Sequence, residues 1–248
     1  MKNDAIAVAW AIAGTLASGI ATAAGGTHWG YAGHEGPEHW GGLAAEFATC
    51  GSGKNQSPVD LVGMVEGDLP AIRVSYRAGG SEILNNGHTV QVNYAPGSSI
   101  GVDGRTFELK QFHVHAPSEN TIEGRSYPME AHFVHADGDG NLAVVAVMFE
   151  EGASSAELEK AWGRMPGQVG EKHALAAQVN ADALLPAGRD YYRYNGSLTT
   201  PPCSEGVVWL VMKDTVTASQ EQIARFTRTL HHANNRPLQP LNARVVVQ

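Results

Sequence analysis

The stretch QFHVH, residues 111–115, places two histidines two positions apart in an apolar run, and EAH, residues 130–132, places a third in the next apolar run. Alternate residues of a β-strand project from the same face, about 6.6–6.8 Å apart along the strand. His113 and His115 are therefore expected on one face, and a strand–turn–strand return brings His132 alongside them. The two runs predict neighbouring strands of one sheet.

Three imidazoles on one face are a donor set for a metal ion. Three neutral histidines with an open fourth position are typical of catalytic zinc, because a structural site fills that position with Cys or His. Metal-bound histidines usually donate their second N–H to a carboxylate or carbonyl group. Gln111 and Glu130 each precede a histidine by two residues on the same face, so we expect them to be these acceptors. One histidine pair is more often ordinary partly buried histidine, whereas the full set predicts zinc bound by His113, His115 and His132.

Composition restricts the possible classes of protein. The chain has 248 residues, of which 43 % are hydrophobic and 17 % charged, as in an ordinary globular protein with one large domain or two small ones. The formal net charge of −8 and the lack of a basic stripe argue against nucleic acid as a partner. The 29 glycines are spread along the chain, which suits short strands joined by turns.

Local patterns predict a single, mainly β domain. Turn-forming pairs such as Asn86-Gly87 and Asp103-Gly104 separate the apolar runs. Strands are expected at residues 72–76, 89–94, 106–115, 129–135, 142–149 and 207–213. Helices are expected at residues 154–164, 172–179 and 219–229, the last with Ser219 as its N-cap.

The first 23 residues are typical of a secretory signal peptide. Lys2 supplies a positive start, residues 6–20 are apolar, and ATA at residues 21–23 fits the small-x-small cleavage rule. An uncleaved membrane anchor is the alternative, but the run is short and rich in Ala and Gly for that role. We therefore expect a mature domain at residues 24–248 that is periplasmic or secreted and has no membrane attachment after cleavage.

Several motifs occur in the order found in one known enzyme family. Besides the histidine motif they are HWGY (28–31), GPEHW (36–40), NQSPVD (55–60), NNGH (85–88), YNGSLTTPPC (194–203) and RPLQPLN (236–242). From about Thr27 to the C-terminus the chain resembles the alpha-class carbonic anhydrases, particularly their secreted bacterial branch. The resemblance implies a large twisted, mostly antiparallel central sheet of about ten strands, with a few short peripheral helices.

The resemblance also implies an activity. It predicts a lyase that reversibly hydrates carbon dioxide to bicarbonate and a proton, through attack of zinc-bound hydroxide on CO₂. Bacterial relatives are often dimers, so a homodimer is expected by analogy alone. Two alternatives are a catalytically silent binding module on the same fold and an enzyme whose biological substrate is an ester. The complete histidine set argues against silence, and esterase activity is expected only as a secondary reaction.

Glu119 and Thr199 resemble the family's orienting pair. An ionised carboxylate only accepts hydrogen bonds, so Glu119 would take the Thr199 hydroxyl proton, and the Thr199 oxygen would then accept from the nucleophile. Without the resemblance, Glu119 would be interpreted as a surface carboxylate. Thr200 is a weaker candidate, expected at the pocket wall in contact with substrate or solvent.

Other positions match the family's substrate wall and proton path. CO₂ is small and apolar, and six residues match the apolar wall, with ordinary core packing as the alternative: Val134, Leu142, Val144, Leu198, Val207 and Trp209. His88 resembles the proton shuttle, because an imidazole gains and loses a proton near neutral pH. An exposed turn histidine is the alternative there. Tyr31, Asn86 and Gln91 match positions that order water between the shuttle and zinc.

The sequence contains two cysteines, Cys50 and Cys203. In an exported chain such a pair is expected to form a disulfide, and members of the bacterial branch have a bridge at matching places. Two free buried thiols are the alternative. A bridge at Cys203 would tether the loop that carries Thr199.

Overall fold

Strands β6 (Arg105–His115) and β8 (Met129–Ala136) carry the histidine motif and pair in antiparallel orientation. The computed structural model describes residues 27–248, so the predicted signal peptide, residues 1–23, lies outside the described residues. His113 lies directly opposite His132 in the pairing register. The predicted return of the chain, which brings His132 beside His113, is therefore confirmed.

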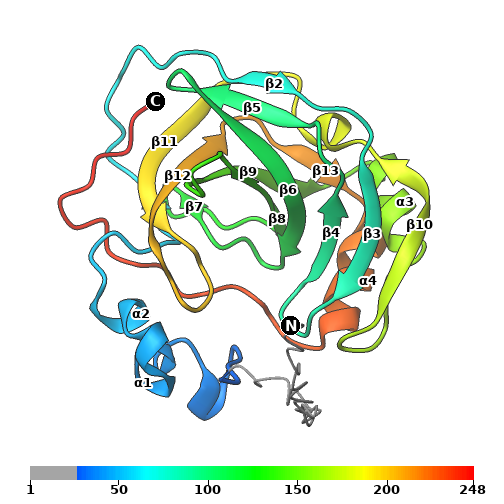
Figure 1. Ribbon diagram of the computed structural model, residues 1–248, viewed down its shortest axis with the longest axis horizontal. Helices are drawn as coiled ribbons and strands as arrows, with labels where there is room; N and C mark the ends of the chain where they lie inside the picture. The colour runs from blue at the N-terminus through cyan, green and yellow to red at the C-terminus, as the bar shows by residue number, and fades with distance from the viewer. Residues whose placement is uncertain (1–26) are drawn as a thin grey trace, which may run out of the picture.

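Within residues 27–248, eleven strands form one sheet whose main path runs β10–β3–β4–β6–β8–β9–β12–β11 (Figure 1). At its sides β13 pairs with β9, and β2 pairs with β5, which pairs with β6. Pairing is antiparallel except where β12 and β13 run parallel to β9. The mostly antiparallel central sheet is thus confirmed. The other strands of this sheet are β2 (Arg73–Ser75), β3 (Gly80–Asn85), β4 (Val90–Tyr94), β5 (Ser99–Val102), β9 (Leu142–Glu151), β10 (Lys172–Val179), β11 (Tyr191–Ser197), β12 (Glu205–Met212) and β13 (Val216–Ala218). Separately, β1 (Asp60–Leu61) and β7 (Thr121–Ile122) form a short parallel pair.

A β-bulge in β6 decides which face the histidines occupy. The register with β8 shifts at Lys110, which is an extra residue on its strand. Before this point odd-numbered side chains such as Leu109 belong to the large apolar core, and beyond it even-numbered side chains such as Phe112 do. An extra residue reverses the alternation that follows it. Without the bulge, His113 and His115 would point into the core.

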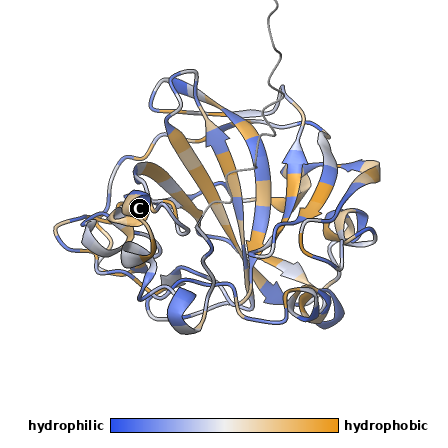
Figure 2. Ribbon diagram, turned by 60° about the horizontal axis from the view of Figure 1, so that its bottom comes forward, coloured by the Kyte–Doolittle hydropathy of each residue, from blue (hydrophilic) through white to orange (hydrophobic). Residues whose placement is uncertain are grey.

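The two faces of the sheet have different coverings. One face packs against α3 (Ala156–Trp162) and α4 (Gln220–Leu230), and the rings of Trp162 and Phe226 lie 5.6 Å apart within this large core. The opposite face carries the three histidines and a smaller apolar cluster that includes Trp209. Hydrophilic and hydrophobic residues alternate along several of the strands (Figure 2).

Both longer helices begin at a serine. Ser155 accepts a hydrogen bond from the Leu158 N–H, and Ser219 forms a capping box with Gln222. The N-cap predicted at Ser219 is therefore confirmed. The other helical pieces are single turns: α1 (Trp40–Leu43), α2 (Thr49–Ser52) and the 3₁₀ turns Gly33–Glu35, Ala45–Phe47 and Ala181–Leu184.

The helix predicted at residues 172–179 is wrong. That segment is β10, which pairs in antiparallel orientation with β3 at the edge of the sheet. Its Ala, Leu, Lys and Gln residues favour a helix by intrinsic propensity. The open side of β3 offers backbone partners instead, and tertiary pairing overrides the local preference. Strands β3, β5, β11 and β13 were not predicted either, and each of them pairs with a neighbouring strand of the sheet.

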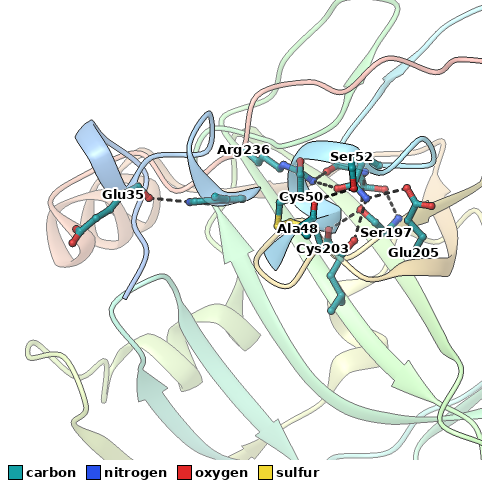
Figure 3. The surroundings of a disulfide bond; sticks show 12 residues. Glu35, Ala48, Cys50, Ser52, Ser197, Cys203, Glu205 and Arg236 are labelled. Atoms are coloured by element: carbon teal, nitrogen blue, oxygen red, sulfur yellow. Dashed lines mark hydrogen bonds between the residues drawn. A yellow bond between two sulfur atoms is a disulfide. The ribbon is translucent and has the colours of Figure 1, made fainter. Parts of the chain in front are cut away.

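A disulfide joins Cys50 of α2 to Cys203 in the loop between β11 and β12, 153 residues apart in sequence (Figure 3). The predicted pairing is confirmed, and free thiols are excluded. The bridge lies beside fully buried Trp40, whose indole N–H donates to the carbonyl groups of Gly30 and Glu35. It therefore ties the loop to the N-terminal part of the described chain. Within residues 27–248, no helix combines the length and apolar character needed to cross a bilayer.

Candidate metal centre

The rings of His113, His115 and His132 face one another on the polar face of the sheet. Their centroids are 5.0 Å apart for His113 and His115, 4.6 Å for His115 and His132, and 5.4 Å for His113 and His132. One ring nitrogen from each lies within 4.8 Å of the other two. The cross-strand register and the period of two along β6 account for this convergence.

Hydrogen bonds select which nitrogen of each ring is free. His113 Nδ1 lies 2.8 Å from Gln111 Oε1, and His132 Nε2 lies 2.9 Å from Glu130 Oε1. Because these oxygens accept, the bonded nitrogens carry the protons. His113 Nε2 and His132 Nδ1 keep their lone pairs. Both contacts lie where the two-residue spacing predicts them.

His115 has an acceptor that sequence reasoning missed. Its Nδ1 donates to the backbone carbonyl of Asn234 at 2.7 Å, which leaves Nε2 with a free lone pair. The Asn234 side chain adds three bonds: its Oδ1 accepts from the Ala116 N–H, and its Nδ2 donates to the carbonyls of His88 and Val114. No spacing rule links residue 234 to residue 115. The RPLQPLN motif that begins two residues later was the only nearby signal.

Glu130 joins the His132 ring to the loop after β6. Its Oε1 also accepts from Asn120 Nδ2 at 2.6 Å, and its Oε2 accepts from the backbone N–H groups of Glu119 and Asn120, each at 2.8 Å. Burial raises the pKa of Glu130, and the hydrogen bonds from Asn120 act in the opposite direction. A carboxylate with this many donors is fixed in place, so it holds both the ring and the loop.

Glu119 is 2 % exposed, which excludes the surface carboxylate weighed from sequence. Its Oε2 lies 3.4 Å from His115 Nε2 and 3.9 Å from His132 Nδ1, and its Oε1 accepts from the Arg236 backbone N–H at 2.8 Å. Burial raises the pKa of Glu119 well above its ordinary value. The hydrogen bond from the Arg236 N–H opposes that rise.

The donor set fits zinc. Within the described chain, buried His115 Nε2 and Glu119 Oε2 have no hydrogen-bond partner. Buried polar atoms are normally satisfied, so two orphans that face each other indicate a place for an ion and its water ligand. Burial lowers the pKa of His113, His115 and His132, which favours the neutral imidazoles that a metal requires. Three imidazoles with a nearby carboxylate suit zinc.

The loop that carries Thr199 is anchored at both ends. At its start, Ser197 Oγ accepts from the Ser57 N–H at 2.9 Å, and the Ser197 carbonyl accepts from Trp209 Nε1 at 3.0 Å. At its end, the Cys203 carbonyl accepts a hydrogen bond from Gln56 Nε2 at 3.0 Å, beside the disulfide (Figure 3). Thr199 itself is 5 % exposed, so its hydroxyl is held in the interior.

A cavity of about 120 Å³ reaches the metal centre. His88 lies in its wall with its ring stacked on Trp29, at a centroid distance of 3.6 Å and an interplanar angle of 8°. Asn86 Oδ1 accepts from the backbone N–H groups of His88 and Thr89, so it also shapes the turn. The residues expected along the proton path all line this cavity, together with the expected wall residue Thr200 and two metal-centre histidines: Tyr31, Asn86, His88, Gln91, Thr200, His113 and His115.

The six expected wall residues gather in the smaller apolar cluster on the same face. Val144, Val207 and Trp209 are buried there, with Val134, Leu142 and Leu198 packed against them. The Trp209 ring meets His132 edge-on at 4.9 Å. They are not among the residues that line the 120 Å³ cavity in the described chain. These residues therefore pack in the core, and their cluster also lies beside the metal centre.

Comparisons with known proteins agree with this geometry. The sequence model of the eukaryotic-type carbonic anhydrase family matches residues 35–248. A carbonic anhydrase of Pectobacterium carotovorum is 48 % identical over 227 residues, covering 92 % of this chain and 93 % of the relative. A carbonic anhydrase of Neisseria gonorrhoeae is 52 % identical over 223 residues, covering 90 % of this chain and 88 % of the relative.

A solved structure extends the agreement to the fold. The alpha-carbonic anhydrase of Thermovibrio ammonificans, in complex with the inhibitor sulfanilamide, is 51 % identical and superposes with a TM-score of 0.89, covering 90 % of this chain and 100 % of that one. The matching family model and these relatives imply the zinc-dependent hydration of CO₂ to bicarbonate, a lyase activity. By sequence, fold and histidine cluster, the chain belongs to the alpha, or eukaryotic-type, carbonic anhydrase family.

Proposed function

We propose that this chain hydrates CO₂ with Glu119 and Thr199 as the pair that orients the nucleophile, and with His88 as the residue that removes the proton. The observation that carries the proposal is the single polar assembly of three histidines and Glu119. One ring nitrogen of each histidine is free, and Glu119 lies 3.4 Å from the free nitrogen of His115.

His113, His115 and His132 would hold the zinc ion. When bound, zinc supplies Lewis-acid chemistry that lowers the pKa of a coordinated water, an effect for which carbonic anhydrase is itself the standard example. Glu119 in its ionised form accepts a hydrogen bond from the Thr199 hydroxyl. The Thr199 oxygen is then left with lone pairs that accept from the nucleophile, so the pair fixes the direction of attack.

The apolar cluster with Trp209 and Leu198 provides a dry surface next to the centre, which suits a small substrate without charge. His88 would take the proton released in each turnover, because its ring lines the cavity that also contains His113 and His115. Secondary hydrolysis of small esters is expected from the same assembly, at lower efficiency. Homodimer formation stays a prediction by analogy.

We also propose that the chain is exported to the periplasm or beyond. The disulfide between Cys50 and Cys203 supports an oxidising compartment. The signal-like features of residues 1–23 agree with it.

The orienting pair is tested by three substitutions in the zinc-loaded enzyme. Thr199→Val removes the hydroxyl, Thr199→Ser keeps it as the matched control, and Glu119→Gln replaces an obligate acceptor by a group that also donates. We expect Thr199→Val and Glu119→Gln to lower kcat/KM for CO₂ by about 10²–10³, as for the loss of one oriented hydrogen-bonding group. Thr199→Ser should retain most activity. A zinc-replete Thr199→Val enzyme as fast as the parent would contradict the proposal.

A further inference from the structure

His88 lies at the boundary between two cavities. It lines the inner cavity of about 120 Å³ that contains His113 and His115, and it also lines an outer cavity of about 570 Å³. Trp29 and Tyr31 are shared by the two cavities as well. A proton that leaves the metal centre through His88 therefore enters the outer cavity.

Two further imidazoles face this outer cavity, those of His28 and His232. His28 Nδ1 lies 3.1 Å from Glu35 Oε2, so this ring is already paired with a carboxylate. His232 has no carboxylate within ion-pair distance among residues 27–248. A group that must release protons to solvent is better without such a partner, so His232 is the stronger candidate.

The tautomer and position of His232 suit a proton acceptor. Its Nδ1 donates to the Ala233 carbonyl at 3.0 Å, so Nε2 keeps a lone pair. Its exposed ring lies 5.7 Å from that of Tyr31, at the rim of the outer cavity. It follows the C-terminal end of α4.

His88 is in the opposite environment. Burial, followed by the imidazoles of His28 and His232, lowers the pKa of His88 to about 4. A proton on His88 is therefore held weakly while its ring is stacked on Trp29.

We propose that His232 is a second relay residue, which takes the proton from His88 across the outer cavity and delivers it to buffer in solution. This inference rests on the proposed shuttle role of His88. In the transfer His88 becomes neutral as His232 Nε2 gains the proton, and a buffer base then removes that proton, so both rings return to their starting state. The cavity, of about 570 Å³, is large enough to hold water molecules between the two rings, and the imidazoles of His88 and His232 and the Asn86 amide are polar groups in its wall.

The test separates proton transfer from the chemistry at zinc. Exchange of ¹⁸O between CO₂ and water reports two rates: the interconversion of CO₂ and bicarbonate, and the release of labelled water, which requires a proton. His232→Asn and His231→Asn are compared in the zinc-loaded enzyme without added buffer. His231 is a matched control because it is adjacent and exposed but lines neither cavity; Asn also tolerates its φ of 62°.

We expect His232→Asn to lower the water-release rate by about three- to tenfold, less than the 10²–10⁴ typical of a direct acid–base group, because water and ions still reach His88. The interconversion rate should be unchanged, His231→Asn should alter neither rate, and added imidazole should restore the loss. If His232→Asn matches His231→Asn, the relay is overturned. His88→Ala separates the two proposals: a lowered release rate there with an unaffected His232→Asn leaves the shuttle standing, whereas an unaffected His88→Ala removes both.

Discussion

His132 and His135 lie three residues apart on β8, and they end in opposite surroundings. His132 faces the metal centre, while His135 lies opposite Leu109 on the side of the large apolar core. They are 1 % and 0 % exposed, so burial does not distinguish them. His135 uses both ring nitrogens: Nδ1 donates to the Ala143 carbonyl at 3.2 Å, and Nε2 accepts from the Tyr76 hydroxyl at 2.5 Å.

At His132, one nitrogen is bound by Glu130 and the other faces His113 and His115. The difference between a structural histidine and a ligand is thus an unused nitrogen directed at others of its kind. The strand period places the two rings on opposite faces, and their neighbours decide what each can do. The sheet sets the face on which each ring lies, and the hydrogen bonds set which ring nitrogen is free.

The same substitution at both positions tests the difference between His132 and His135. His132→Gln should lose tightly bound zinc and nearly all CO₂ hydration, because one of three ligands is removed. His135→Gln keeps an acceptor for the Tyr76 hydroxyl and should retain zinc and activity. Elemental analysis for zinc and stopped-flow CO₂ hydration measure both effects. Equal loss of zinc in the two variants would show that the distinction between them is wrong.

A second prediction concerns how the two faces are held together. The metal face depends on a loop that is tied from outside by Cys50 and Cys203, whereas the core face is packed by α3 and α4. The double change Cys50→Ser and Cys203→Ser should lower the free energy of unfolding by about 2–5 kcal/mol. It should also lower kcat/KM while zinc is retained, because the ligands lie on strands and Thr199 lies on the loop. Guanidinium unfolding, zinc content and CO₂ hydration test this prediction. An unchanged kcat/KM in the double variant would show that the disulfide does not position the loop that carries Thr199.

The third and smallest effect is a pH dependence of stability that arises on the core face. Burial lowers the pKa of His135 to about 4, below the ordinary value near 6.5. Between these values the unfolded chain binds a proton that the folded chain does not. Stability should therefore be lost as pH falls from about 6.5 to about 4, by up to about 3 kcal/mol.

His135→Gln removes this titration and provides the control. Its free energy of unfolding should fall less between pH 7 and pH 4.5 than that of the parent, measured by urea denaturation. Tyr76 is the titratable side chain that contacts the ring, and its phenol stays neutral throughout this range. Identical slopes for parent and variant would assign the acid sensitivity to other groups.

The sequence predicted the parts of this molecule that follow from short-range periodicity. The strands that carry His113 and His132 were placed within one residue, because alternation in apolar runs reports a buried sheet directly. The bulge at Lys110 was not predicted, although it sets the face of the histidines. It appears only in the register with β8, which depends on tertiary pairing.

Hydrogen-bond partners that are distant in sequence could not be predicted either. Nothing local to Asn234 or Arg236 shows that their backbone groups reach His115 and Glu119. Backbone donors and acceptors are present at every residue, so no side-chain pattern marks the few that are used. The helix prediction at residues 172–179 failed for a related reason. An edge strand is defined by the strand that it pairs with rather than by its own composition.

The most direct test of the account is zinc content and CO₂ hydration measured on the same sample of the parent protein, before and after treatment with a chelator and after zinc is returned. About one zinc ion per chain is expected, as for one three-histidine site. The rate of CO₂ hydration should fall with the zinc content and return with it. Activity that persists after the zinc is gone, or full zinc occupancy without CO₂ hydration, would show that these three histidines do not form the catalytic centre.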